Sequence, residues 1–168
     1  MREVLQRQAA FVHLTLDEAD AFLARETVVD PAFAHFVHAC DSRGVPVTVL
    51  SSGIKPLIHR ALSRAGLSEL PIVANDVRTS ADGWTIDFID DSDNGHDKAA
   101  TVRASAAAGN DTVYCGDGHS DFAAAIMANH RFAKSGRALE EYLQNAGINF
   151  TPFTTFKTVE QALFPLPR

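Results

Sequence analysis

Short apolar segments alternate with segments of helical spacing from Val45 to Ala146, and this alternation constrains the fold more than any other feature. The runs VPVTVLSS, at 45–52, and DTVYC, at 111–115, are rich in β-branched residues and lack polar alternation, which is typical of buried strands. Strands that alternate with helices predict an α/β fold, in which helices cover both faces of a parallel sheet.

Capping residues and glycines predict where the helices begin and end. Thr15 with Glu18 three residues later forms a capping signal, so we expect a helix from Leu16. Pro31 after an aspartate starts a second helix, and Gly44 ends it. The other predicted elements are helices at 54–66, 98–109, 121–129, 135–147 (with Ser135 as cap) and 158–164, strands at 71–76 and 131–134, and a β-hairpin at 76–88.

Composition excludes several classes of function. A chain of 168 residues with 46% apolar residues is long enough to bury a core. The net charge of −6 and the absence of a Lys/Arg cluster argue against a nucleic-acid partner. No apolar run approaches the length of a membrane span, and two cysteines in apolar segments suggest reduced thiols. We therefore expect a cytoplasmic protein without a membrane or nucleic-acid partner.

The segment LSSG follows the first predicted strand, in the region where α/β folds bind ligands. Ser51 and Ser52 fall where the chain leaves the strand, and Gly53 permits a tight turn into a helix. Backbone N–H groups at a helix start, beside a hydroxyl, can form an anion site. Taken alone, the segment is better explained as a serine helix cap with a glycine turn.

The segment CGDGHSD follows the strand DTVYC and contains two carboxylates. Asp117 at a strand end has the oxygen ligands that Mg²⁺ prefers, while Asp121 lies where the helix dipole favours negative charge. A loop with a capping aspartate explains Asp121 but not the glycines at 116 and 118. Lys98 begins an earlier helix, where the dipole disfavours a cation, so it is suited to neutralise a nearby anion. Taken alone, it is better explained as an ordinary surface lysine.

Ser51, Lys98, Asp117 and Asp121, in this order, resemble the second, third and fourth motifs of the haloacid dehalogenase superfamily of phosphohydrolases. The chain is most similar to the phosphoserine-phosphatase-like branch. Its tail, from 131 to 159, resembles the methionine-salvage phosphatases that act on 2-hydroxy-3-keto-5-methylthiopentenyl-1-phosphate. The resemblance extends from about Leu16 to Leu163 and implies a Rossmann-like core.

The resemblance implies a role for each matched residue in binding phosphate. Ser51 would bond a phosphate oxygen, helped by backbone N–H groups near Ser52 and Gly53. Lys98 would neutralise the phosphate and hold the nucleophile. Ser120, at a position where phosphoserine phosphatases often carry asparagine, would be a substrate-binding residue. These assignments imply that a small phosphorylated metabolite is the substrate.

The resemblance also implies a metal ion and a reaction type. Asp117 would bind Mg²⁺, and Asp121 would support the metal site from close by. In this superfamily an aspartate nucleophile attacks a phosphate monoester, and water hydrolyses the resulting aspartyl-phosphate.

The first motif of the superfamily, a D-x-D-G-T-like run on a central strand that carries the nucleophile, has no counterpart ahead of Ser51. Residues 1–29 resemble the remnant of a helical cap, and residues 30–168 a core without its first strand. We therefore expect an unpaired edge on VPVTVL and on DTVYC, left empty, closed by direct pairing, or filled by another chain in an oligomer. Two hypotheses follow: a phosphatase that lacks its nucleophile segment here, and a non-catalytic remnant that binds phosphate and metal.

Two further groups of residues carry side chains that can bind a metal ion. The acidic run from Asp87 to Asp97, which includes Asp90 to Asp93, resembles both a first motif and a calcium loop. It lacks the following helix of a first motif, apart from the helix that carries Lys98, and it has Val102 where the twelfth-position glutamate of a calcium loop would stand. A solvated acidic loop explains it better. Among seven scattered histidines, only His119 lies inside a candidate site.

Overall fold

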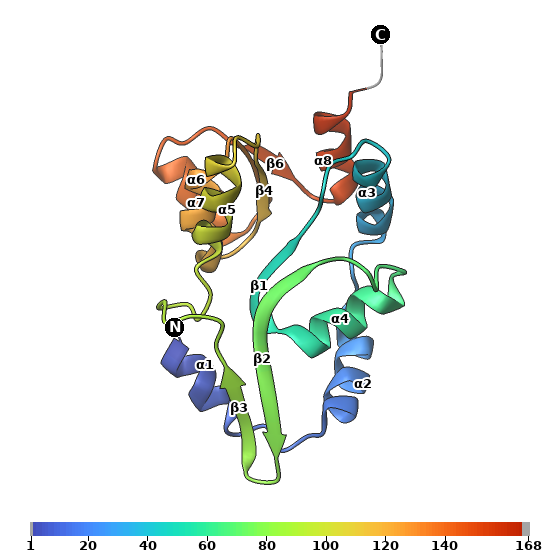
Figure 1. Cartoon of the computed structure of the whole chain (residues 1–168), viewed down its shortest axis with the longest axis vertical. Coiled ribbons are helices and arrows are strands. Elements are labelled where there is room, and N and C mark those ends of the chain that lie inside the picture. Colours follow the sequence, from blue (N-terminus) through green and yellow to red (C-terminus); the bar gives the residue numbers. More distant parts are fainter. Residues whose placement is uncertain (1, 166–168) are drawn as a thin grey trace. The chain divides into compact units, whose positions relative to one another are not determined.

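The structure, a computed structural model, describes residues 2–165 and divides into two compact units, Met1–His96 and Asp97–Arg168 (Figure 1). Each unit contains one three-stranded sheet. The mixture of strands and helices confirms the α/β class predicted from the alternating segments.

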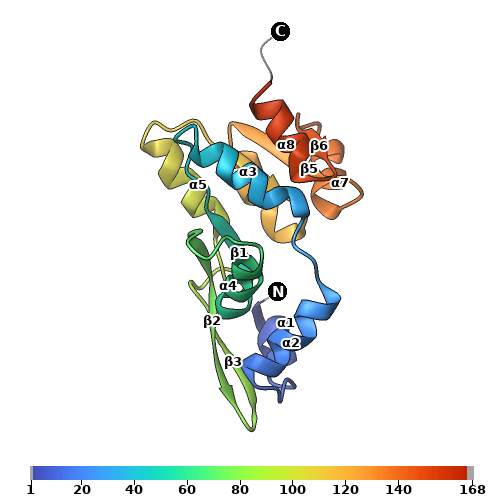
Figure 2. The same cartoon turned by 90° about the vertical axis from the view of Figure 1, so that its right-hand side faces the viewer.

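The first unit contains a sheet of strand order β1-β2-β3. Its elements are α1 (Arg2–Ala9), α2 (Leu16–Glu26), α3 (Pro31–Asp41), β1 (Val49–Ile54), α4 (Lys55–Arg64), β2 (Ile72–Ser80) and β3 (Gly83–Asp87). The first half of β2 pairs in parallel with β1, and its second half pairs antiparallel with β3. Figure 2 shows the two strands of this predicted hairpin running side by side to their turn.

Local signals fix the starts of the helices α2 and α3. The Thr15 hydroxyl accepts a hydrogen bond from Glu18 N at 3.2 Å, and the Glu18 carboxylate accepts one from Thr15 N at 2.8 Å, which completes the predicted capping box. The Asp30 carboxylate accepts the N–H of Ala32, and Pro31 occupies the first turn of α3. Both helix starts are therefore confirmed.

The core of the first unit forms where α1 and α2 meet the hairpin. Trp84 and Ile86 on β3 are buried with Ala9 and Ala19, and partly buried apolar side chains surround them. The Trp84 indole N–H donates to the carbonyl of Leu14 at 2.6 Å, so its polar atom is satisfied inside the core. In Figure 1, α1 lies against β3 and α2 against α4.

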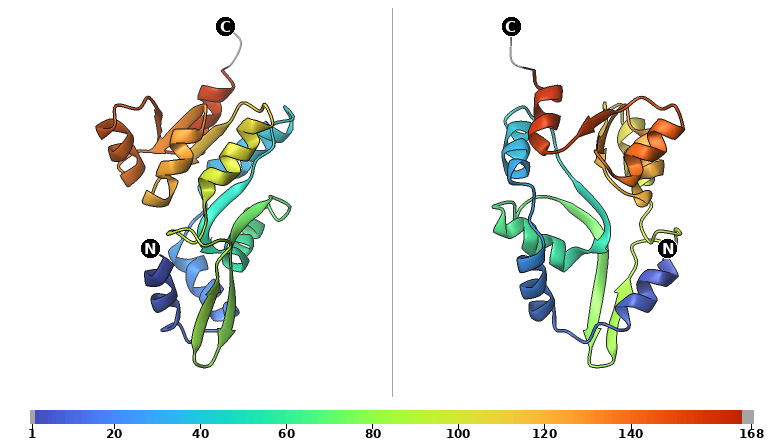
Figure 3. Two further views of the ribbon diagram at one scale, coloured as in Figure 1. Left: turned by 60° about the vertical axis from the view of Figure 1, so that its left-hand side comes forward. Right: turned by 180° about the vertical axis from the view of Figure 1, so that it is seen from behind.

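The second unit contains a parallel sheet of strand order β4-β5-β6. Its elements are α5 (Lys98–Ala107), β4 (Val113–Gly116), the short 3-10 helix η1 (His119–Asp121), α6 (Phe122–Met127), β5 (His130–Lys134), α7 (Ala138–Asn145), β6 (Thr151–Phe153) and α8 (Phe156–Leu163). Helices α6 and α7 pack on β4 and β5 (Figure 3), and Ala124, Ala133, Leu139 and Leu143 between them are fully buried.

The first strand differs from its prediction at both ends. It begins at Val49 rather than at position 45, because its parallel partner β2 begins only at Ile72, opposite Val49. It continues through Ile54, so Ser51–Gly53 lie inside the strand and not after it. The five positions of β1 from Leu50 to Ile54 face only three of β2, from Val73 to Asn75, and this irregularity of register takes up the serines and the glycine.

Two other expectations need correction, and one strand was not expected. Helix α4 is capped by Ile54 without a side-chain bond, so the helix-cap interpretation of the serines is wrong. Helix α7 begins at Ala138 with Arg137 as N-cap, and Ser135 does not cap it. The strand β6 was not predicted.

The strands form two separate sheets, with β1 at an edge of one and β4 at an edge of the other. Within the described residues, β1 bonds only to β2 and β4 only to β5. The described part of segment 1–29 forms helices and no strand, as expected for a helical segment. Val113 on β4 is 40% exposed, so this strand is less buried than its composition suggested. No helix among residues 2–165 combines the length and the apolar character that crossing a membrane requires.

Candidate functional site

The loop after β4 makes a tight connection from the strand to η1 and α6. A Cβ atom at Gly116 would lie 2.8 Å from the Cβ, Cγ and Oδ2 atoms of Asp121, closer than real Cβ contacts allow. Glycine at this position therefore lets the Asp121 side chain fold back against the end of the strand. The loop is fixed from the other side by the N–H of Leu139, which donates to the carbonyl of Asp117 at 3.0 Å.

The Asp121 carboxylate accepts four hydrogen bonds. Its Oδ2 atom accepts the backbone N–H groups of Asp117 at 2.9 Å and Gly118 at 2.8 Å. Its Oδ1 atom accepts the Lys98 ammonium at 2.7 Å and the Tyr114 hydroxyl at 2.8 Å. The carboxylate thus holds the loop with one oxygen and two side chains with the other.

Lys98 begins α5 and is 7% exposed, as is the side chain of Asp121 with which it pairs. Its Nζ atom also donates to the Ser120 hydroxyl at 2.9 Å. Burying a lone ammonium would be very unfavourable, and an opposite charge at hydrogen-bond distance offsets that penalty. The structure therefore brings together Lys98, Ser120 and Asp121, three of the predicted site residues.

The environment of this pair shifts two pKa values. Burial alone would raise the pKa of Asp121, but the charge and hydrogen bond of Lys98, with the backbone N–H groups of Gly118 and Asp117, hold it below its ordinary value. Burial and the neighbouring Asp121 carboxylate raise the pKa of the Tyr114 hydroxyl well above its ordinary value. Asp121 is therefore charged and Tyr114 is a neutral donor near pH 7.

Asp117 contrasts with Asp121. It is exposed, and its carboxylate makes no hydrogen bond or ion pair with the described residues. No group of three or more His, Cys, Asp or Glu side chains within residues 2–165 is arranged to hold a metal ion. Mg²⁺ needs only one or two carboxylates when waters and substrate phosphate complete its octahedral shell. The free Asp117 carboxylate fits such a site, and Asp121 is committed to positioning the loop.

The predicted phosphate-binding serines lie in the first unit, at the irregular end of β1. The Ser51 hydroxyl accepts the N–H of Gly53 at 3.0 Å, and the Ser51 carbonyl lies 3.0 Å from His96 Nδ1. The Ser52 carbonyl accepts the amide of Asn75 at 2.8 Å, while the Ser52 hydroxyl is buried without a partner among the described residues. Because these residues and Lys98 belong to different units, their convergence at one site stays a prediction.

Two residues with clear structural roles were not singled out from the sequence. The sequence predicts Tyr114 only as part of a strand, and its hydroxyl contact with Asp121 is made across the strand–helix turn. Asn75 is fully buried and joins the Ser52 carbonyl to the N–H of Ile89. A polar residue within an apolar strand was the available signal for Asn75.

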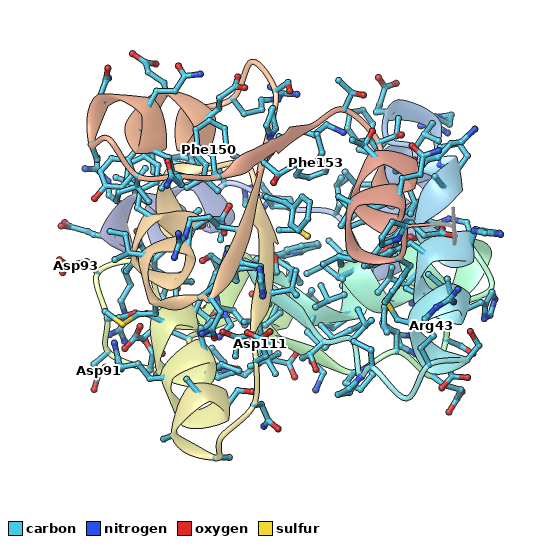
Figure 4. The ribbon with its side chains drawn as sticks, turned by 90° about the horizontal axis from the view of Figure 1, so that it is seen from above. Arg43, Asp91, Asp93, Asp111, Phe150 and Phe153 are labelled. Carbon is cyan, nitrogen blue, oxygen red and sulfur yellow. The ribbon has the colours of Figure 1, made fainter. Side chains whose placement is uncertain are left out.

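The acidic run between β3 and α5 forms a loop without helix or strand, as predicted. The side chain of Asp91 is 99% exposed and pairs with Arg2 at 2.6 Å. Asp91 and Asp93 lie at the outer edge of the loop in Figure 4. His119 is exposed, and its ring lies 5.3 Å from that of Phe122.

Comparison with known proteins identifies relatives along most of the chain. A model of the haloacid dehalogenase-like hydrolases matches residues 2–125. Pdp3-interacting factor 1 of Schizosaccharomyces pombe is 38% identical over 171 residues, which cover 96% of this chain and 75% of that protein. Polyol phosphate phosphatase PYP1 of Saccharomyces cerevisiae is 33% identical, over 88% of this chain and 68% of that protein.

Two more distant matches are also phosphatases. The 2-hydroxy-3-keto-5-methylthiopentenyl-1-phosphate phosphatase of Brevibacillus brevis is 26% identical, over 84% of this chain and 66% of that protein. The crystal structure of an apo phosphoserine phosphatase superposes with a TM-score of 0.68 at 14% identity, covering 95% of this chain and 78% of that one. The chain therefore belongs to the haloacid dehalogenase-like hydrolase family, within which it resembles the phosphatases of the phosphoserine-phosphatase-like branch.

Proposed function

We propose that this chain carries the phosphate- and metal-binding part of a Mg²⁺-dependent phosphate monoester hydrolase that acts on a small phosphorylated metabolite in the cytoplasm. The observation that carries the proposal is the buried Lys98–Asp121 pair beside the uncommitted carboxylate of Asp117. Two relatives are named as phosphatases of a polyol phosphate and of a keto-pentenyl phosphate, both small metabolites.

Lys98 is suited to bind a phosphate oxygen. An ammonium group has three donors, and the described contacts use two, to Ser120 and to Asp121. The third donor remains for a substrate oxygen, and the low exposure of the ammonium strengthens its interaction with an anion. Phosphoryl transfer depends chiefly on such positioning and neutralisation of charge.

Asp117 would hold the Mg²⁺ ion. When bound, the ion would neutralise charge on the phosphate oxygens. Asp121 contributes indirectly, because its bonds to the N–H groups of Asp117 and Gly118 fix the backbone that presents the Asp117 carboxylate. Ser51, with the N–H groups around Ser52 and Gly53, would bind further phosphate oxygens.

No strand within residues 2–165 carries a D-x-D run of the first-motif type, which would supply the nucleophile of the proposed aspartyl-phosphate mechanism. The D-x-D run at Asp91 to Asp93 lies in an exposed loop, with Asp91 paired to Arg2. We infer that a first-motif aspartate outside residues 1–168 supplies the nucleophile.

Hydrolysis assays test the proposal. Residues 1–168 and a longer chain that includes the coding sequence upstream of Met1 are assayed with p-nitrophenyl phosphate and with polyol phosphates, with and without Mg²⁺. We expect turnover only from the longer chain with Mg²⁺, and loss of turnover in its Asp117→Asn variant. Asp111→Asn is a matched control, because Asp111 is an exposed aspartate that pairs with His130.

Two outcomes would contradict the proposal. Hydrolysis by residues 1–168 alone, abolished by Asp117→Asn, would place the nucleophile within this chain. An upstream sequence without a first motif, together with binding of Mg²⁺ and phosphate but no turnover, would instead support a non-catalytic remnant.

A further inference from the structure

We propose that Tyr114 is a positioning residue of the site, whose hydroxyl fixes the Asp121 carboxylate and through it the Lys98 ammonium. The inference rests on the proposed function for its consequence in catalysis, but its geometry lies wholly within the second unit. Tyr114 itself would not contact the phosphate.

The two oxygen atoms of the Asp121 carboxylate accept hydrogen bonds from different kinds of donor. The Oδ2 atom is held by two backbone N–H groups of its own loop, those of Asp117 and Gly118. The Oδ1 atom is held by two side chains from other elements, Tyr114 on β4 and Lys98 on α5. Without the Tyr114 hydroxyl, Oδ1 would keep only the ammonium at the end of a flexible lysine side chain.

Tyr114 is the more rigid of the two donors to Oδ1. Its ring belongs to the β4 strand and is 7% exposed, so its hydroxyl is placed by packing. A lysine has four rotatable side-chain bonds and a compact head with no preferred fork geometry. The tyrosine therefore determines where Oδ1 lies, and the ammonium follows the oxygen.

The acceptor of the Tyr114 hydroxyl distinguishes a positioning role from a purely structural one. A buried tyrosine commonly satisfies its hydroxyl with whatever acceptor is nearest. Here the acceptor is the same oxygen atom that binds Lys98, and burial leaves little access for water to replace the lost donor. Removal of the hydroxyl should therefore first raise the mobility of the Lys98 side chain and weaken the hydrogen bonds of the two loop N–H groups.

Tyr114→Phe removes only the hydroxyl, and Tyr142→Phe is the matched control. Tyr142 is the other tyrosine of the chain, and its ring stacks on Phe122 at 3.9 Å, a contact that phenylalanine preserves. Both variants are made in the full 168-residue chain. Amide hydrogen exchange is measured by NMR, and acetylation of Lys98 by acetic anhydride is measured by mass spectrometry.

In Tyr114→Phe we expect the amides of Asp117 and Gly118 to exchange about tenfold faster or more, since a lost hydrogen bond to a charged group corresponds to at least that factor. Acetylation of Lys98 should accelerate, while the amide of the fully buried Leu143 keeps its protection. Tyr142→Phe should change none of these rates.

Unchanged exchange and unchanged Lys98 reactivity in Tyr114→Phe would overturn the inference. A uniform loss of protection that includes Leu143 would also overturn it, by assigning Tyr114 a structural role alone. None of these readouts needs metal, substrate or turnover, so they stand even if the hydrolysis assays fail. Conversely, Mg²⁺-dependent hydrolysis with unaltered rates in Tyr114→Phe would leave the proposed function intact and remove Tyr114 from it.

Discussion

Replacing Lys98 with methionine should destabilise the second unit strongly. The substitution keeps most of the apolar stem and removes the charge that neutralises Asp121, whose side chain is only 7% exposed. Removing one partner of a buried ion pair costs about 3–5 kcal/mol, since the other charge is left without compensation. Three hydrogen-bond donors to Asp121 remain, from Tyr114, Asp117 and Gly118. We therefore expect a loss of stability at the lower end of this range, about 3 kcal/mol.

Urea unfolding measures this effect. Tyrosine absorbance reports on the second unit, because Tyr114 and Tyr142 both lie there, whereas the fluorescence of Trp84 reports on the first. A loss of about 3 kcal/mol is a large part of the roughly 5–15 kcal/mol that stabilises a typical domain. The tyrosine transition of Lys98→Met should therefore move to a clearly lower urea concentration.

Two further variants separate lost charge compensation from lost packing. Adding Asp121→Asn to Lys98→Met removes the uncompensated charge, so the double variant should be at least as stable as Lys98→Met. Arg103→Met is the matched control in the same unit, since it breaks an ion pair with Asp97 in which both side chains are solvent-exposed. The reasoning would be refuted if Lys98→Met shifted the tyrosine transition no more than Arg103→Met does.

Three more predictions concern the loop after β4 and the start of α2. Gly116→Ala should displace the Asp121 side chain, since its Cβ would meet that side chain at 2.8 Å, and a raised rate of exchange at the amide of Asp117 would report it. Thr15→Ala should lower the free energy of unfolding by about 1 kcal/mol through loss of the helix cap, measured by urea unfolding with Trp84 fluorescence. The backbone and side-chain hydrogen bonds of Thr15 lower the pKa of Glu18. The contribution of the Glu18 carboxylate to the free energy of unfolding is therefore complete above the ordinary pKa of 4.5, and it is lost as the pH falls through the folded-state pKa. Glu18→Gln should therefore weaken the dependence of stability on pH in that acid range, and an unaltered dependence would exclude the capping box as its source.

The sequence predicted those parts of the fold that local chemistry decides. The starts of α2 and α3 follow from a capping box at Thr15 and from Pro31, whose effects reach only one turn. The strand–loop–helix unit around Asp117 was recognisable because two glycines bracket a carboxylate after an apolar strand. Lys98 was identified because a cation is unfavourable at a helix start unless an anion compensates it, and Asp121 is that anion.

Features that depend on distant pairing were missed or misplaced. The end of β1 is set by its register against β2, where Ile54 faces Asn75, and no property of the LSSG segment reveals that partner. The strand β6 contains three residues including Pro152, and it becomes a strand because β5 lies beside it. The contact of Tyr114 with Asp121 likewise depends on how the chain folds back after Gly116.

The double pairing of β2 also orders the events by which the first unit folds. Its second half pairs with β3 across a turn at Ala81 and Asp82, and hairpins closed by so few residues form in roughly 1–10 μs. Its first half pairs in parallel with β1, which requires the whole of α4 to cross over first and is therefore slower. The hairpin can thus act as a template that lines up β1, and Asn75, at the junction of the two halves, fixes the Ser52 carbonyl only once that second step is complete.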